Sequence, residues 1–197
     1  MAQATETKAA TAVADPAPLG LIGFATTTLI AGAFYGFTGA APAAFIGLAF
    51  FFGGGAQLLA GMWEFKNGNT FGGVAFTSYG AFWLAVWYSL TNSAITADFL
   101  KSSNNGWFLL GWTIVTGIYL IGTFRLNYGL VAVFGLLFLT FLLLCIGQFN
   151  GAAPGTGLTA VAGYVAIATA VAAYYNALAG ILRSVGADLL PVFPVNK

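Results

Sequence analysis

Long apolar stretches separated by short polar segments dominate the pattern of this chain. Six of the stretches are each roughly 20 residues long, the length that a helix needs to cross the hydrocarbon core of a bilayer. The segments between them are rich in Gly, Pro, Asn and Ser, which interrupt helices and favour turns. The pattern therefore predicts six transmembrane helices, over residues 17–39, 42–65, 71–91, 107–124, 129–149 and 158–182.

The few basic residues fall mostly on one side of this predicted topology. Six spans return both ends of the chain to the same side, which carries Lys8, Lys66, Arg125, Arg183 and Lys197. The other side carries Lys101 alone. Cytoplasmic loops are enriched in Lys and Arg, so we expect a multi-pass protein of the cell membrane with both termini cytoplasmic. Residues 1–14 are expected to form a disordered cytoplasmic tail, residues 15–183 the transmembrane domain, and residues 184–197 a C-terminal cytoplasmic tail.

The composition agrees with a membrane protein and excludes several functions. Of the 197 residues, 59% are hydrophobic and 6% are charged, whereas a typical soluble domain is about 25% charged. The absence of histidine excludes His-based catalysis and His metal sites, and the single cysteine, Cys145, excludes an internal disulfide. The net charge of +1 gives no basic field for nucleic acid. The sequence contains no phosphate loop or metal-ligand motif, so we expect neither an enzyme nor a cofactor.

The polar side chains inside the predicted spans are mostly hydroxyls and amides. Such groups are expensive in lipid and face either a partner helix or a water path. Thr27 lies in a run of three threonines, and Thr77, Ser78 and Tyr79 are adjacent in the third span. Three adjacent positions on a helix cannot all face one helix interface. We therefore expect part of each cluster to line a path through the bundle.

Gln57 lies midway between Gly53 and Gly61, and the four-residue spacing places all three on one helix face. Glycine on that face allows a neighbouring helix to approach closely. The Gln57 amide then either lines a pore or makes a structural hydrogen bond, and the residues alone favour neither alternative. Gly53 also begins a run of three glycines, which either loosens the helix locally or packs tightly.

Two acidic residues lie where predicted spans begin or end. Asp15 precedes Pro16 and Pro18, an order that predicts a helix entry with Asp15 as the N-cap and the prolines around the first turn. Free N–H groups at such an entry also attract anions. Glu64, at the end of the second span, is the one acid near the membrane interior. It is either an interfacial carboxylate, solvated or paired with a base, or a group that couples transport to protons.

A permeation path fits these features better than an enzyme does. A path lined by hydroxyls and interrupted by apolar side chains suits a small, weakly charged solute, because hydrated ions resist an apolar constriction. A non-transporting membrane scaffold or sensor is the alternative from another class.

Two motifs resemble those of the acetate uptake transporter family, which includes the bacterial succinate–acetate permeases. The segment Asp15-Pro16-Ala17-Pro18-Leu19-Gly20-Leu21 resembles the Asn-Pro-Ala-Pro-Leu-Gly-Leu signature of that family, with Asp15 in place of the usual Asn. A longer match covers residues 54–72 and continues through residues 75–83. The resemblance extends from residue 15 to about residue 183 and is weaker after residue 95.

The resemblance implies an all-α membrane protein with six transmembrane helices per protomer, assembled as a homo-hexamer with one pore per subunit. It implies transport of acetate, and in some members of succinate, through a channel or by proton-coupled symport. By motif position it implies a hydrophobic constriction of Phe24, Tyr79 and Leu137, and a small residue, Ala173, that tunes substrate size. Residues and resemblance together predict a substrate path past Thr27, Gln57, Thr77, Ser78 and Ala173, with Glu64 as the candidate for proton coupling.

Two other channel types share part of this pattern. Water and glycerol channels use two Asn-Pro-Ala motifs that meet in the middle of the membrane, whereas this chain has one such segment, at a helix entry. Ammonium carriers use pore histidines, which this chain lacks, although ammonium has been linked to some members of the resembled family. Ammonium or another small solute is therefore the alternative substrate to acetate.

Overall fold

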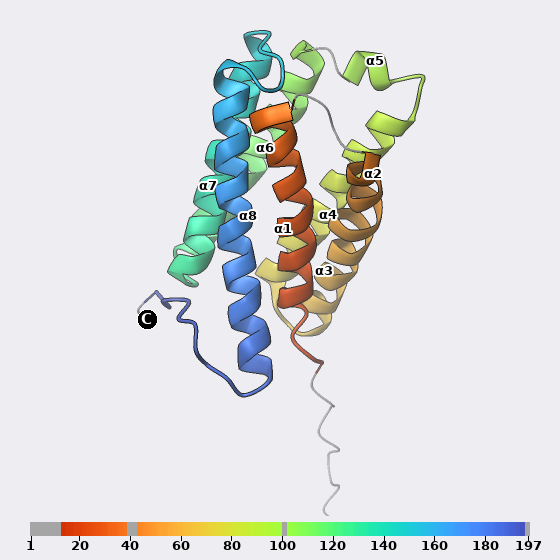
Figure 1. The fold of residues 1–197 in the computed structure, drawn as a ribbon. Coiled ribbons are helices and arrows are strands. Elements are labelled where there is room, and N and C mark those ends of the chain that lie inside the picture. The colour runs from red at the N-terminus through yellow and green to blue at the C-terminus, as the bar shows by residue number, and fades with distance from the viewer. Residues whose placement is uncertain (1–12, 39–42, 100–101, 196–197) are drawn as a thin grey trace, which may run out of the picture.

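The computed structural model describes residues 13–38, 43–99 and 102–195, and within these ranges the chain forms a bundle of helices. The helices lie side by side, and α1 begins at the same end of the bundle at which α8 ends (Figure 1). In chain order the elements are α1 (Ala17–Ala33), the π-helix η1 (Phe34–Thr38), α2 (Ala43–Phe50), the π-helix η2 (Phe51–Ala56), α3 (Gln57–Lys66), α4 (Thr70–Thr91), α5 (Thr96–Phe99), α6 (Ser102–Thr123), α7 (Tyr128–Phe149) and α8 (Gly157–Ser184).

Within the described ranges, five segments are long and apolar enough to cross a membrane. They are Ala17–Phe37, Ala43–Lys66, Ser103–Thr123, Tyr128–Phe149 and Gly157–Ser184. These segments confirm an all-helical, multi-pass membrane protein. The predicted third span corresponds to α4, which has 22 residues, as do α6 and α7, but is not one of the five. A sixth span therefore stays a prediction.

The predicted limits of the spans are close to the observed ones, with one clear error. The fourth span is predicted to begin at residue 107, after a turn-like segment of Ser, Asn and Gly over residues 102–106, but α6 already begins at Ser102. Ser, Asn and Gly weaken a helix without forbidding it, and Asn105 and Gly106 are buried in the bundle. Packing has overridden local propensity here.

The glycine run after Phe52 widens its helix rather than breaking it. Gly53, Gly54 and Gly55 lie in η2, and the segment from α2 to α3 stays helical throughout. A side chain on Gly53 would collide with Thr27 of α1, so this widened segment packs closely against α1. The contacts of α8 with α1 and η1 are equally close, because a Cβ on Gly163 would overlap the backbone of Gly32 in α1 and of Gly36 in η1. Small residues permit such approaches between membrane helices.

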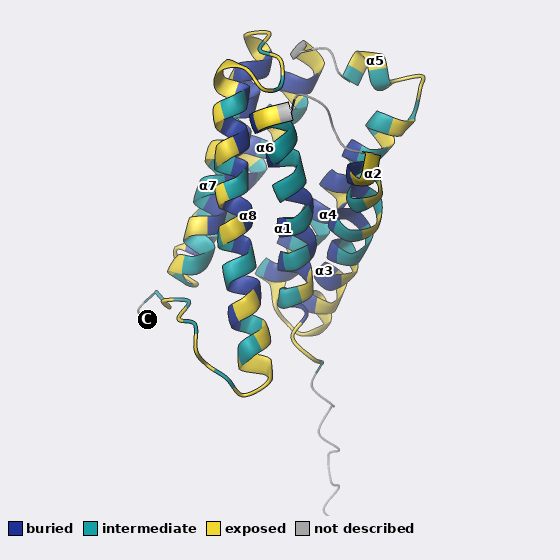
Figure 2. Ribbon diagram, viewed as in Figure 1, coloured by how far each residue is buried: buried dark blue, intermediate teal, exposed yellow. Residues whose placement is uncertain are grey.

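The distribution of exposed side chains fits a lipid environment. Buried positions alternate with exposed ones along α4, α7 and α8 (Figure 2). Many of the exposed positions are large and apolar, for example Ile118, Ile121 and Val171. Apolar side chains on the outside of a bundle are costly in water and favourable in hydrocarbon.

After α8 the chain runs back, without regular structure, to the start of α7 (Figure 1). The N–H groups of Tyr128 and Gly129, in the first turn of α7, donate to the carbonyls of Phe193 at 2.9 Å and Val192 at 3.2 Å. These N–H groups have no partner within their own helix. The C-terminal segment therefore satisfies donors that the start of α7 leaves free.

Asparagine side chains cap the N-termini of α4 and α7. Asn69 Oδ1 accepts the N–H of Gly72 at 3.1 Å, and Asn127 Oδ1 accepts that of Leu130 at 2.8 Å. Asn69 has a second role, because its Nδ2 donates to Glu64 Oε2 at 2.9 Å and so connects α4 to α3.

A comparison of the two caps tests the hydrogen bond between Asn69 and Glu64. Replacing either asparagine by alanine removes a cap worth about 1 kcal/mol. Asn69→Ala also leaves the buried Glu64 carboxylate without its donor, which costs roughly a further 1–3 kcal/mol. We expect the melting temperature of the purified protein in detergent to fall more for Asn69→Ala than for Asn127→Ala. Equal losses would mean that the bond to Glu64 does not stabilise the fold.

Candidate functional site

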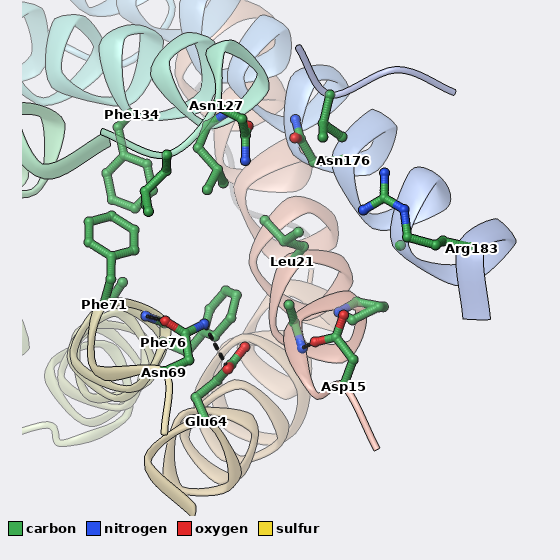
Figure 3. Close-up of a pocket in the computed structure, with 18 residues that line it drawn as sticks. Asp15, Leu21, Glu64, Asn69, Phe71, Phe76, Asn127, Phe134, Asn176 and Arg183 are labelled. Carbon is green, nitrogen blue, oxygen red and sulfur yellow. Dashed lines mark hydrogen bonds between the residues drawn. The ribbon is translucent and has the colours of Figure 1, made fainter. Parts of the chain in front are cut away.

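Three cavities follow one another through the bundle. The first, which we call the vestibule, has a volume of about 340 Å³ and lies where α1 begins and α8 ends (Figure 3). The middle cavity has about 20 Å³ and the far cavity about 40 Å³. The vestibule and the middle cavity share the lining residues Leu21, Ala75, Phe76 and Phe134. These shared walls make the cavities consecutive.

The residues predicted as a constriction separate the middle cavity from the far one. Phe24, Tyr79 and Leu137 are buried and line both cavities. They come from α1, α4 and α7, and the ring centroids of Phe24 and Tyr79 are 5.7 Å apart. A cavity needs about 10–15 Å³ for one water, so the middle cavity has room for little more than one. The observed conformation is therefore closed to a molecule of several heavy atoms.

Contacts with residues of α6 fix the orientation of the Tyr79 side chain. Its hydroxyl shares a 2.8 Å hydrogen bond with Thr116 Oγ1, and its ring packs against Trp112 and Tyr119. A buried tyrosine whose hydroxyl has a partner contributes an apolar surface to the cavity that its ring faces. The ring of Phe24, Tyr79 and Leu137 is therefore apolar despite the phenol group.

Gln57 lines the middle cavity with an amide that has no hydrogen-bond partner among the described residues. Its side chain is 0% exposed, and neither Oε1 nor Nε2 is paired. A buried unpaired amide is costly. Of the two alternatives that the sequence left open, a structural hydrogen bond is absent from this part of the structure, and the position on the cavity wall favours a path-lining amide.

Two further unpaired polar groups line the far cavity, on the other side of the ring. They are Thr28 Oγ1 and Trp83 Nε1, both buried and without a partner among the described residues. The sequence analysis did not select either. Thr28 lies four residues after Phe24. The helical repeat alone could therefore have shown that Thr28, and not Thr27, shares the helix face of Phe24.

Four residues predicted for the substrate path do not line any of these three cavities. Thr27 Oγ1 donates to Gly23 O at 3.0 Å in its own helix. Ser78 Oγ shares a 2.9 Å hydrogen bond with Tyr119 OH, and Thr77 lies against Gly61 of α3. Ala173 is completely buried. All four lie within the bundle and away from the cavity walls, and their role in transport stays a prediction.

Glu64 differs from the interfacial carboxylate that the sequence suggested. It is 1% exposed, and its partner is the amide of Asn69 rather than water or a base. Lys66 is exposed and lies outside the vestibule wall. Glu64 lines the vestibule, and its Oε1 has no partner among the described residues. Asn69 lies in the short polar segment between the second and third predicted spans, and its bond to Glu64 was not predicted.

The helix-entry motif also lies at the vestibule, with one change in its capping. The N-cap of α1 is Pro16, whose carbonyl accepts the N–H of Gly20 at 3.2 Å, and not Asp15 as expected. Asp15 Oδ1 accepts the N–H of Ala17 at 2.9 Å. Asp15 thus satisfies a free donor of the first turn from one residue further out, because the N-cap proline has no side-chain oxygen that could accept it. Asp15 and Pro18 line the vestibule.

Several named proteins are similar in sequence to most of this chain. An acetate permease A from Emericella nidulans is 41% identical over 188 residues, which cover 87% of this chain and 62% of the relative. A succinate-acetate/proton symporter, SatP, from Escherichia coli is 35% identical over 189 residues, covering 92% and 96%. An ammonia transport outward protein 2 from Saccharomyces cerevisiae is 39% identical over 178 residues, covering 85% and 61%. The chain thus spans about three fifths of the length of the first curated relatives that it matches.

A solved structure and a family profile also match this chain. A solved structure of the bacterial acetate channel SatP is 34% identical and superposes with a TM-score of 0.83 over 91% of this chain and 99% of that one. The profile of the GPR1/FUN34/yaaH family matches residues 2–195, and the chain belongs to this family.

Proposed function

We propose that this protein is a membrane permease for acetate and other small carboxylates, succinate among them, and not an enzyme. The observation that carries the proposal is the apolar ring of Phe24, Tyr79 and Leu137, which lies between two cavities that each present an unpaired polar group. The names of the relatives, an acetate permease, a succinate-acetate/proton symporter and an acetate channel, support the same substrate class.

The geometry suggests how such a permease discriminates. A carboxylate enters the vestibule, meets the Gln57 amide in the middle cavity and must then pass an apolar ring. An apolar constriction admits a small solute only after most of its water has been removed. Removing water from an ion is far more costly than removing it from a neutral molecule. The ring therefore favours a small acid that crosses with its charge neutralised.

We further propose the finer architecture that the resemblance implies. It comprises six spans, with α4 as the third, a homo-hexamer with a separate path in each subunit, and both termini in the cytoplasm. The equal lengths of α4, α6 and α7 support α4 as a span. In this arrangement the vestibule opens to the cytoplasm, because it lies at the end of the bundle where α1 begins and α8 ends.

A flux assay tests the proposal directly. The purified protein in liposomes is expected to give saturable uptake of labelled acetate, while protein-free liposomes give only slow leakage of the acid. Labelled methylammonium in the same liposomes tests the ammonium alternative, which the name of the yeast relative raises. Uptake of methylammonium without acetate would replace the proposal by that alternative, and uptake of neither would favour a non-transporting scaffold.

The constriction can be tested at Leu137. Leu137→Ala removes three carbon atoms from the ring, so we expect uptake of larger monocarboxylates, such as butyrate, to rise roughly tenfold relative to acetate. Leu139→Ala is the matched control, because Leu139 lies two residues away on α7 but is 40% exposed and lines none of the three cavities. Because truncation of a buried leucine is destabilising, Leu137→Val serves as a milder second variant. Unchanged selectivity in both Leu137 variants would remove Leu137 from the constriction.

Proton coupling through Glu64 gives a further test. Glu64 has a buried carboxyl group on the vestibule wall with one unpaired oxygen, so in its protonated form it is positioned to pass a proton to an incoming carboxylate and is left as a carboxylate itself. If it does so, acetate uptake rises as the pH on the uptake side is lowered, and Glu64→Gln abolishes most of this rise. Asp15→Asn removes an exposed carboxylate from the same cavity and is the control. An unaltered pH dependence in Glu64→Gln would mean that acetate carries its own proton as the neutral acid.

A further inference from the structure

We propose that Arg183 first binds the substrate carboxylate in the vestibule, and that Asp188 is an internal carboxylate that competes with the substrate for Arg183. The inference deepens the proposed function and rests on it. It assigns a binding residue and its competitor to a cavity whose other walls are apolar, amidic or acidic.

Arg183 is the one described cation on the vestibule wall. It lies in the last turn of α8, and Figure 3 shows its side chain, with Asn176, across the cavity from Glu64 and Asn69. The other described cations, Lys66 and Arg125, do not line the vestibule. Asp15 and Glu64 do line it, and their negative charge opposes the entry of another carboxylate. Arg183 is therefore the group that offsets this repulsion.

The hydrogen bonds between Arg183 and Asp188 are long, so another carboxylate can compete for Arg183. Arg183 Nη2 and Nε donate to the same oxygen, Asp188 Oδ1, at 3.3 Å and 3.4 Å. A bidentate arginine–carboxylate pair uses both oxygens at about 2.7–2.9 Å. The two side chains are 52% and 72% exposed, so water screens the pair. A free carboxylate that can use both oxygens has a better geometry available than Asp188 shows here.

The turn after α8 holds Asp188 in this position. The N–H of Gly186 donates to Arg183 O at 3.1 Å, and that of Ala187 donates to Leu182 O at 2.9 Å. With Gly186 at φ 81°, these two bonds form the Schellman motif, which reverses the chain at a helix end. The reversal brings Asp188 back beside the helix that it follows.

The part of the C-terminal segment that follows Asp188 is also held in place by hydrogen bonds. Tyr175 OH donates to Pro191 O at 2.8 Å, and the carbonyls of Val192 and Phe193 accept donors at the start of α7. A carboxylate tethered in this way has an effective concentration on the order of millimolar or above. Asp188 therefore competes with millimolar acetate and sets the concentration at which the substrate occupies Arg183.

A double-mutant cycle tests this competition. The readout is equilibrium exchange of labelled acetate across liposomes, from which the half-saturating concentration and the maximal rate are obtained separately. Asp188→Asn is expected to lower the half-saturating concentration about threefold, and Arg183→Gln to raise it about threefold, the range typical of an exposed ion pair. In the double variant, Asp188→Asn is expected to have no further effect. The maximal rate of exchange should change little in any of them.

Arg125→Gln is the matched control, because it removes an exposed cation that does not line the vestibule. If Arg125→Gln raises the half-saturating concentration as much as Arg183→Gln, general surface charge explains the effect and the proposal fails. It also fails if Asp188→Asn acts equally with and without Arg183. Normal acetate exchange with unchanged half-saturating concentrations in all variants would overturn this inference alone, whereas no acetate exchange by the unaltered protein would overturn the proposed function with it.

Discussion

A polar side chain inside a lipid-embedded bundle has no surrounding water, so it must pair within the protein or face a cavity. This constraint divides the buried polar groups of the present structure into two classes. Thr113 and Thr169 are typical of the first class, because each donates to a carbonyl one turn earlier in its own helix. Gln57, Thr28 and Trp83 belong to the second class, and all three line the middle or the far cavity. Thr77 Oγ1, which lies against Gly61, is an exception, because it is unpaired and lines none of the three cavities. The other unpaired groups among the described residues mark the path more sharply than polarity alone does.

The helical segments could be predicted from the sequence because their ends carry strong local signals. Asn127 and Asn150 flank α7, and the predicted span over residues 129–149 differs from Tyr128–Phe149 by one residue. Tertiary packing decides the remaining features. The start of α6 at Ser102 and the π-helical form of η2 both depend on neighbouring helices, and no pattern within those segments reports such contacts.

Less of the candidate site could be predicted, because a single sequence gives the spacing of residues but not the direction in which a helix faces. The spacing placed Gly53, Gln57 and Gly61 on one face, and all three are buried. In the threonine run it could not distinguish Thr27, which bonds within α1, from Thr28, which lines the far cavity. The resemblance supplied Phe24, Tyr79 and Leu137, and the structure brings them to the same two cavities. The bonds of Glu64 to Asn69 and of Arg183 to Asp188 join side chains of separate structural segments, and the sequence pattern gave no sign of them.

The charged groups of the path are confined to one end of it. The vestibule carries Asp15, Glu64 and Arg183, whereas none of the described residues that line the middle and far cavities is charged. A carboxylate can therefore be held as an anion only in the vestibule, and it meets the apolar ring where no opposite charge lines the wall. Neutralisation of the substrate, whether by Glu64 or by a proton taken from solution, has its natural place before the ring. The same separation explains why a loose, exposed pair such as Arg183 and Asp188 suits the entrance, since a tightly bound carboxylate would not leave for the interior.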